Sequence, residues 1–222
     1  MSEPAITMEE DLLVERIAVL LGFGKLSDRL PGGIYPPYLY LVVFIFLDFG
    51  VVNTYIHFFN DSSHVFVNSP YVAVAPVALI LGAVGIRYFS KGYTKAVENL
   101  PLDRVDTETA PFNRIIPLRV KLVAYGIAVF VIYAHYLGNV GIESILAARE
   151  AVSLVNFMFV WQVGYLPFLV EFGLLYFAIH VLLPRRIVNA DVSMFFYDTR
   201  NMGGFAPVGK LLVVAVGNGR VQ

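Results

Sequence analysis

The stretch YLYLVVFIFLDFGVVNTYIHFF, residues 38–59, is apolar along most of its length and carries one acidic residue, Asp48, near its middle. The hydrocarbon layer of a bilayer is about 30 Å thick, and a helix needs roughly 20 predominantly apolar residues to cross it. The stretch meets that requirement, so we predict a transmembrane helix at 38–59.

Three further stretches have the same character. They predict spans at about 71–89, 120–140 and 161–183. The apolar region that contains the last span is about 30 residues long, which is too short for two crossings and a turn. Pro167 lies inside that span, where neighbouring groups can bond the carbonyls that a proline leaves free. We expect Trp161 and Tyr165 to lie at the headgroup level, where amphipathic rings collect.

The composition agrees with an all-α integral membrane bundle of about four transmembrane helices. The chain of 222 residues is 58% hydrophobic and 15% charged, whereas soluble domains are about half apolar and a quarter charged. The net charge of −1 argues against a partner nucleic acid, since proteins that bind phosphates carry an excess of Lys and Arg. The chain has no cysteine, which excludes disulfides, cysteine-ligated zinc and iron–sulfur clusters.

Basic residues alternate between the connections. Segment 60–70 has no Lys or Arg, and 141–160 has Arg149 alone. The connection 90–119 and the tail that follows the last span are rich in them: Lys91, Lys95, Arg104, Arg114, Arg119, Arg185 and Arg186. Because cytoplasmic loops carry the excess of Lys and Arg, we predict a multi-pass protein of the cell membrane with both termini and loop 90–119 in the cytoplasm.

The N-terminal segment, 1–37, has the pattern of an amphipathic helix. Thr7 and Glu10 match a capping box. An apolar stripe follows at helical spacing, formed by Leu13, Ile17, Leu20 and Leu21. The other face is mainly acidic and carries Glu9, Glu10, Asp11, Glu15 and Arg16. An acidic face does not suit an anionic leaflet, so we expect this helix to pack on its own chain or on a partner protein.

The C-terminal tail, 185–222, contains a short apolar run, LLVVAV, at 211–216. Six residues are too few to cross a bilayer. The run fits either a short packed element or the beginning of a fifth span that is cut off.

Two carboxylates, Asp48 and Glu171, fall near the middle of their spans, where an ionised group is costly. One interpretation is an ion or proton site that both residues form. The other is that each acid is hydrogen-bonded and holds helices together. We expect their partners among four residues: Tyr133, Asn156, Gln162 and Tyr176.

Histidines offer a weaker candidate for a site. His57, His135 and Glu143 are predicted near the outer ends of their spans, and imidazole and carboxylate are zinc ligands. A haem is not expected, because His57 and His135 differ by about 6 Å in depth. We therefore predict no cofactor.

The most distinctive polar stretch is FFYDTRNMGGFAP, residues 195–207. It is a candidate cytoplasmic docking loop, and turn chemistry explains the same residue types. Its candidate residues are Asp198, Arg200, Asn201, Gly203 and Gly204.

No set of side chains resembles a nucleophile with its base. The sequence therefore favours a non-enzymatic membrane subunit, scaffold or assembly component, with other membrane subunits or further copies of the chain as partners. The first alternative is a transporter or channel-like protein that uses Asp48 and Glu171. The second is a membrane-embedded metal-dependent enzyme.

Overall fold

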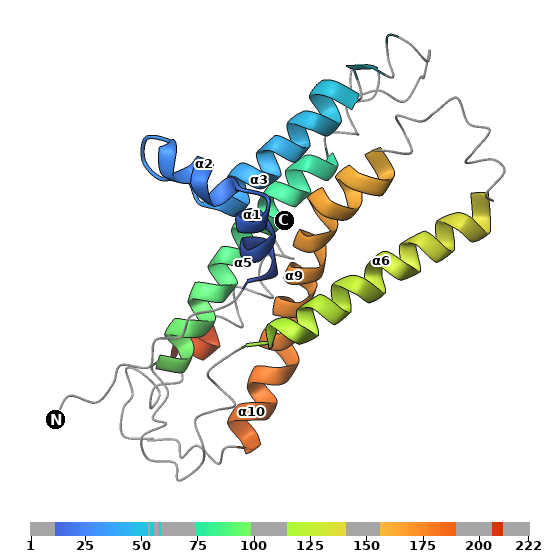
Figure 1. The fold of residues 1–222 in the computed structure, drawn as a ribbon. Coiled ribbons are helices and arrows are strands. Elements are labelled where there is room, and N and C mark those ends of the chain that lie inside the picture. Colours follow the sequence, from blue (N-terminus) through green and yellow to red (C-terminus); the bar gives the residue numbers. More distant parts are fainter. Residues whose placement is uncertain are drawn as a thin grey trace. The chain divides into compact units, whose positions relative to one another are not determined.

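A computed structural model describes residues 12–52, 54, 55, 58, 74–98, 115–140, 156–189 and 206–210 of the chain (Figure 1). Over these ranges the secondary structure is helical and contains no β-strand. The predicted all-α class is confirmed for this part of the chain. The candidate residues His57 and Glu143 and the whole candidate docking loop, from Asp198 to Gly204, lie outside it.

Three short helices come first. They are α1 (Leu13–Leu20), α2 (Phe23–Arg29) and α3 (Pro36–Ile45). Pro36 and Pro37 begin α3, where the missing N–H groups of proline have no intrahelical partner to lose. α3 continues as a π-helical segment, η1 (Phe46–Val52), which contains Asp48.

Two long helices follow, α5 (Val74–Glu98) and α6 (Leu118–Val140). The chain then forms one helical run of four segments: η5 (Asn156–Tyr165), α9 (Leu166–Phe177), η6 (Ala178–Leu182) and α10 (Leu183–Asn189). The region around the last predicted span is therefore one long helix.

Three helices in the described residues are long and apolar enough to cross a membrane: Val74–Val97, Leu118–Asn139 and Phe159–Asn189. The helix Pro36–Val52 is apolar but shorter, with 17 residues or about 25 Å of length. It covers the first part of the predicted span at 38–59. These helices are compatible with a membrane protein.

The helix at the second predicted span extends beyond its expected end at residue 89. α5 reaches Glu98, because the segment after Phe89 has no proline and keeps a stripe of buried residues. This stripe comprises Tyr93, Ala96 and Val97. Polarity alone set the predicted boundary, and polarity does not end a helix that still packs on one face.

The chain divides into two compact units. The larger unit comprises Leu12–Val84 and Leu118–Glu171. The smaller unit comprises Met1–Asp11, Gly85–Pro117 and Phe172–Gln222.

Tyr40 is the centre of an aromatic core in the larger unit. Its ring centroid lies 5.5 Å from that of Phe23, 5.0 Å from that of Phe44 and 5.3 Å from that of Phe168. Phe44 in turn packs against Gly164, where an added Cβ would lie 2.3 Å from the ring atom Cδ1. α3 and η5 therefore approach so closely that only glycine fits at position 164.

In the smaller unit, Arg186 of α10 links two other segments. Its guanidinium donates from Nη1 to the Tyr93 hydroxyl, at 3.1 Å, and from Nη2 to the Ile115 carbonyl, at 3.0 Å. Arg186 thereby connects α10 with the end of α5 and with the residues that precede α6.

The buried face of α1 differs from the expected stripe. Leu13, Val14 and Ala18 are buried, whereas Leu20 is 86% exposed. The predicted stripe was wrong at Leu20, because the helix ends there and the chain turns away at Gly22, which has a φ of 88°.

Candidate functional site

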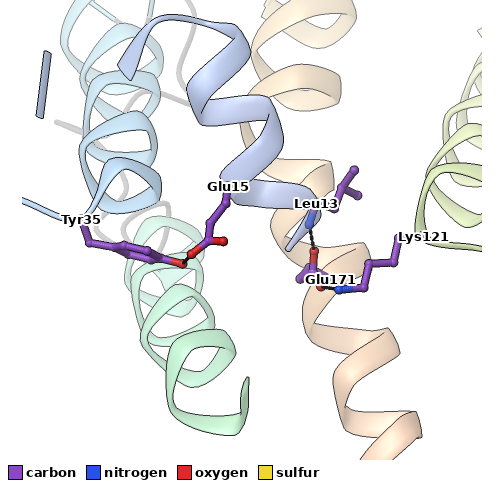
Figure 2. Close-up of polar contacts among 5 residues, drawn as sticks. All are labelled: Leu13, Glu15, Tyr35, Lys121 and Glu171. Atoms are coloured by element: carbon purple, nitrogen blue, oxygen red, sulfur yellow. Dashed lines mark hydrogen bonds and ion pairs between the residues drawn. The ribbon is translucent and has the colours of Figure 1, made fainter. Parts of the chain in front are cut away.

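Glu171 lies in α9 and is fully buried. Its Oε1 atom is 2.7 Å from Nζ of Lys121, which is also buried and comes from the first turn of α6 (Figure 2). Removing two ionised groups from water is costly unless they are paired. The two side chains therefore form an ion pair that joins α6 to α9.

The second oxygen of Glu171 bonds the beginning of α1. The backbone N–H of Leu13 donates to Oε2 (Figure 2), and the N–H of Val14 also bonds the carboxylate. The first N–H groups of a helix have no intrahelical acceptor, and the N-cap residue here, Leu12, has no polar side chain to supply one. Glu171 therefore acts as the capping side chain of α1, and its negative charge interacts favourably with the positive N-terminal end of the helix dipole.

A second contact ties α1 to the start of α3. The hydroxyl of Tyr35 donates to Oε1 of Glu15 (Figure 2). Tyr35 is the residue immediately before α3. α1 is thus held at its first turn by α9 through Glu171 and beside α3 through Glu15.

Asp48 is buried in η1 and has a different partner from that of Glu171. The Tyr165 hydroxyl donates to its Oδ2, at 2.9 Å, and also lies 3.4 Å from the Phe44 carbonyl. Tyr165 precedes Glu171 by six residues, which is about 9 Å along a helix. The two carboxylates therefore occupy different levels of the larger unit.

Two backbone carbonyls near Pro167 are bonded by tyrosines from other helices. Proline has no N–H, so the carbonyls four and five residues earlier, those of Val163 and Gln162, lose that donor. The Tyr40 hydroxyl donates to the Val163 carbonyl, and the Tyr125 hydroxyl donates to that of Gln162 at 2.9 Å. The expectation that neighbouring groups satisfy the carbonyls freed by Pro167 is confirmed.

The side chain of Gln162 is buried as well, and its Oε1 has no hydrogen-bond partner among the described residues. Gln162 belongs to η5, which packs against η1, the segment that carries Asp48. Two π-helical segments thus contact each other in the larger unit, and π-helical turns recur at functional sites.

The partners of Glu171 and Asp48 differ from the predicted ones. Neither Lys121 nor Tyr165 is among the four residues that were predicted. Tyr165 was expected at the headgroup level, but it is buried with its hydroxyl on Asp48. The one usable signal was the charge of Lys121, a basic residue inside one predicted span that could neutralise an acidic residue in another.

Of the three candidate metal residues, His135 is the one that the structure describes. His135 is exposed on α6, and one of its ring nitrogens lies 2.8 Å from Nδ2 of Asn139. Among the residues that the structure covers, no group of three or more His, Asp or Glu side chains could hold a metal ion.

The site around Glu171 balances its own charges. An acceptor with two donors from a helix terminus and one from an ammonium group can fix three segments in place. No family model matches the chain, and searches of curated proteins and of solved structures find no match either.

Proposed function

We propose that the chain is a four-span integral membrane protein that serves as a non-enzymatic subunit or assembly component of a membrane complex. The helix that begins at Pro36 is the first of these spans in the sequence, and the three longer helices are the others. An amphipathic N-terminal segment, loop 90–119 and both termini lie on the cytoplasmic side. The observation that carries the proposal is that Glu171, the most buried acid among the described residues, pairs with Lys121 and with the first N–H groups of α1.

A carboxylate in a transmembrane segment costs about 2.5–3.5 kcal/mol on insertion scales. Ionisable residues therefore usually occur in spans only where they line a pathway for ions or protons, or where they pair with other groups inside the bundle. Glu171 is paired with Lys121 and with the first N–H groups of α1. Asp48 is bonded by Tyr165. These contacts favour a role in holding the helices together.

The surface of α6 supports an association with other membrane helices. Only 6% of the apolar stretch of α6 is buried, whereas 44% of the corresponding stretch in the helix Phe159–Asn189 is buried. Its exposed residues include a stripe at helical spacing: Val120, Val123, Ile127, Phe130 and Leu137. α6 therefore offers its apolar sides to lipid, to a partner subunit or to a second copy.

The test uses the absence of cysteine in the chain. Single cysteines at Ile127 and Phe130 would be cross-linked in native membranes, and the products would be identified by mass spectrometry after purification in mild detergent. We expect cross-links to a second membrane protein or to another copy. A chain that is monomeric in mild detergent and yields no cross-link at either position would contradict the proposed role. Tags at the two termini that report opposite sides of the membrane would refute the topology.

A second candidate function is the movement of protons or cations past Asp48. The contact between η1 and η5 favours it, since Asp48 belongs to η1 and Gln162, whose Oε1 has no hydrogen-bond partner among the described residues, belongs to η5. In vesicles that contain the purified chain, Asp48→Asn would then abolish flux while assembly persists. Lys91→Gln, an exposed position on α5, is the control. Equal flux in all variants would exclude this function.

A further inference from the structure

The turn between α1 and α2 exposes apolar side chains to an unusual degree. Leu20 is 86% exposed and Val19 is 61% exposed, and Leu21 and Leu26 are also open. They surround Gly22, at which an added Cβ would meet no atom within 4 Å. The residues Val19, Leu20, Leu21 and Leu26 are named the apolar tip here.

The position of the apolar tip along α3 follows from aromatic contacts. Phe23, the first residue of α2, packs against Tyr40 at a centroid distance of 5.5 Å. Tyr40 comes four residues after Pro36, the first residue of α3, and is therefore about 6 Å along that helix. If α3 enters the bilayer at Pro36, the tip lies at the depth of interfacial helices, which bury their apolar face by about 5–10 Å.

The charges near the apolar tip are mainly basic. Lys25 and Arg29 are exposed on α2, and Arg16 is exposed on α1. Asp28 is the one exposed acid among the described residues of α1 and α2, because the carboxylate of Glu15 receives the Tyr35 hydroxyl. Of the acidic residues on the face expected from the sequence, Glu15 is the one that the structure describes.

We propose that the apolar tip inserts into the leaflet at which α3 begins, with Lys25 and Arg29 binding the phosphates of anionic lipids. Exposed apolar side chains flanked by basic residues are the pattern of interfacial membrane anchors. This inference depends on the proposed membrane assignment, because α3 supplies the reference depth. It adds a lipid contact that is separate from the spanning helices.

The test places an environment-sensitive fluorophore on a single cysteine, Leu20→Cys, in the full-length chain reconstituted in vesicles. Leu20 contacts little of its own chain, so the label leaves the fold unchanged. Quenching is measured with a nitroxide on the lipid acyl chains and with aqueous iodide, in vesicles with and without anionic phospholipid. A label at Ile127→Cys, on the exposed side of α6, is the control for lipid contact.

We expect the acyl-chain nitroxide to quench the label at position 20, and more strongly in anionic vesicles. Lys25→Gln with Arg29→Gln should lower the ratio of docked to undocked tip by roughly fivefold for each charge removed. The matched variant Lys91→Gln should leave it unchanged. If iodide quenches the label on Leu20→Cys while the acyl-chain nitroxide quenches the label on Ile127→Cys, this inference is overturned and the membrane assignment stands. Failure of lipid to quench either label would overturn the membrane assignment, and this inference with it.

Discussion

The buried pair of Glu171 and Lys121 permits a quantitative prediction. Glu171→Gln keeps the shape of the side chain and an acceptor for the N–H groups of α1, but it removes the counter-ion of Lys121. The ammonium group of Lys121 then loses the carboxylate at 2.7 Å while it stays buried. We expect the variant to be less stable and α1 to separate from α9.

The magnitude follows from the geometry. At 2.7 Å, two unit charges attract by about 6 kcal/mol at an effective dielectric constant of 20. Part of this is offset because the glutamine is cheaper to bury than the carboxylate. Breaking a buried pair by removing one partner costs about 3–5 kcal/mol, and we expect Glu171→Gln to fall in that range. Replacing both residues with neutral ones, as in Glu171→Gln with Lys121→Met, should cost less, because the buried charges are removed together and the glutamine keeps an acceptor for the N–H groups of α1.

The assay is reversible unfolding in mixed micelles of mild detergent and dodecyl sulfate, for the parent chain, the single variants Glu171→Gln and Lys121→Met, and the double variant that combines them. A thiol reagent applied to Ala18→Cys, a fully buried position on α1, reports separation of that helix. Labelling should be slow in the parent and fast with Glu171→Gln. The reasoning would be refuted if Glu171→Gln costs less than about 1 kcal/mol, or if the single-variant costs simply add in the double variant.

Three other outcomes follow from the packing. Gly164→Ala should lower the free energy of unfolding by about 1–3 kcal/mol, because its Cβ would overlap the ring of Phe44. The same substitution should cost less in a chain that already carries Phe44→Ala, because the ring is then absent. Tyr165→Phe removes a hydrogen bond to a charged group if Asp48 is ionised, and it should then lower the free energy of unfolding by about 1.5–3 kcal/mol. In a chain that already carries Asp48→Asn, the same substitution should lower it by less. Arg186→Lys keeps the charge but cannot bond both acceptors, so the free energy of unfolding should fall by about 0.5–1.5 kcal/mol in the same assay, and an unchanged value would contradict the role of the guanidinium.

The long apolar helices could be predicted because a length of lipid-compatible sequence is a strong signal. The compensation at Pro167 could be predicted as well, since a proline within a buried helix leaves carbonyls that must find donors. The identity of the donors, Tyr40 and Tyr125, could not. To identify these donors, one must know how each helix is rotated about its own axis. A helix that is apolar on all sides carries no pattern that fixes that rotation.

The charged partners were missed for related reasons. Tyr165 follows Trp161 at a spacing of four residues and resembles an interfacial aromatic pair, and their rings do pack at 5.4 Å. Only the position of η1 shows that the Tyr165 hydroxyl meets Asp48. Lys121 stands near the beginning of its span, where a long side chain ordinarily reaches toward the headgroups. Its use as a counter-ion depends on where α9 crosses α6, which the linear sequence does not encode.

The contacts of α1 also indicate an order of assembly. A helix of eight residues without an N-cap side chain is marginal by itself, because nucleation fixes several residues for few hydrogen bonds. Glu171 supplies the missing acceptors, but it is stable as a buried anion only when Lys121 is beside it. α6 and α9 must therefore pack together before α1 gains its cap. The first helix in the sequence of the larger unit is, on this reasoning, among the last to become stable, so Glu171→Gln should release α1 while the contact between Tyr125 and η5 persists.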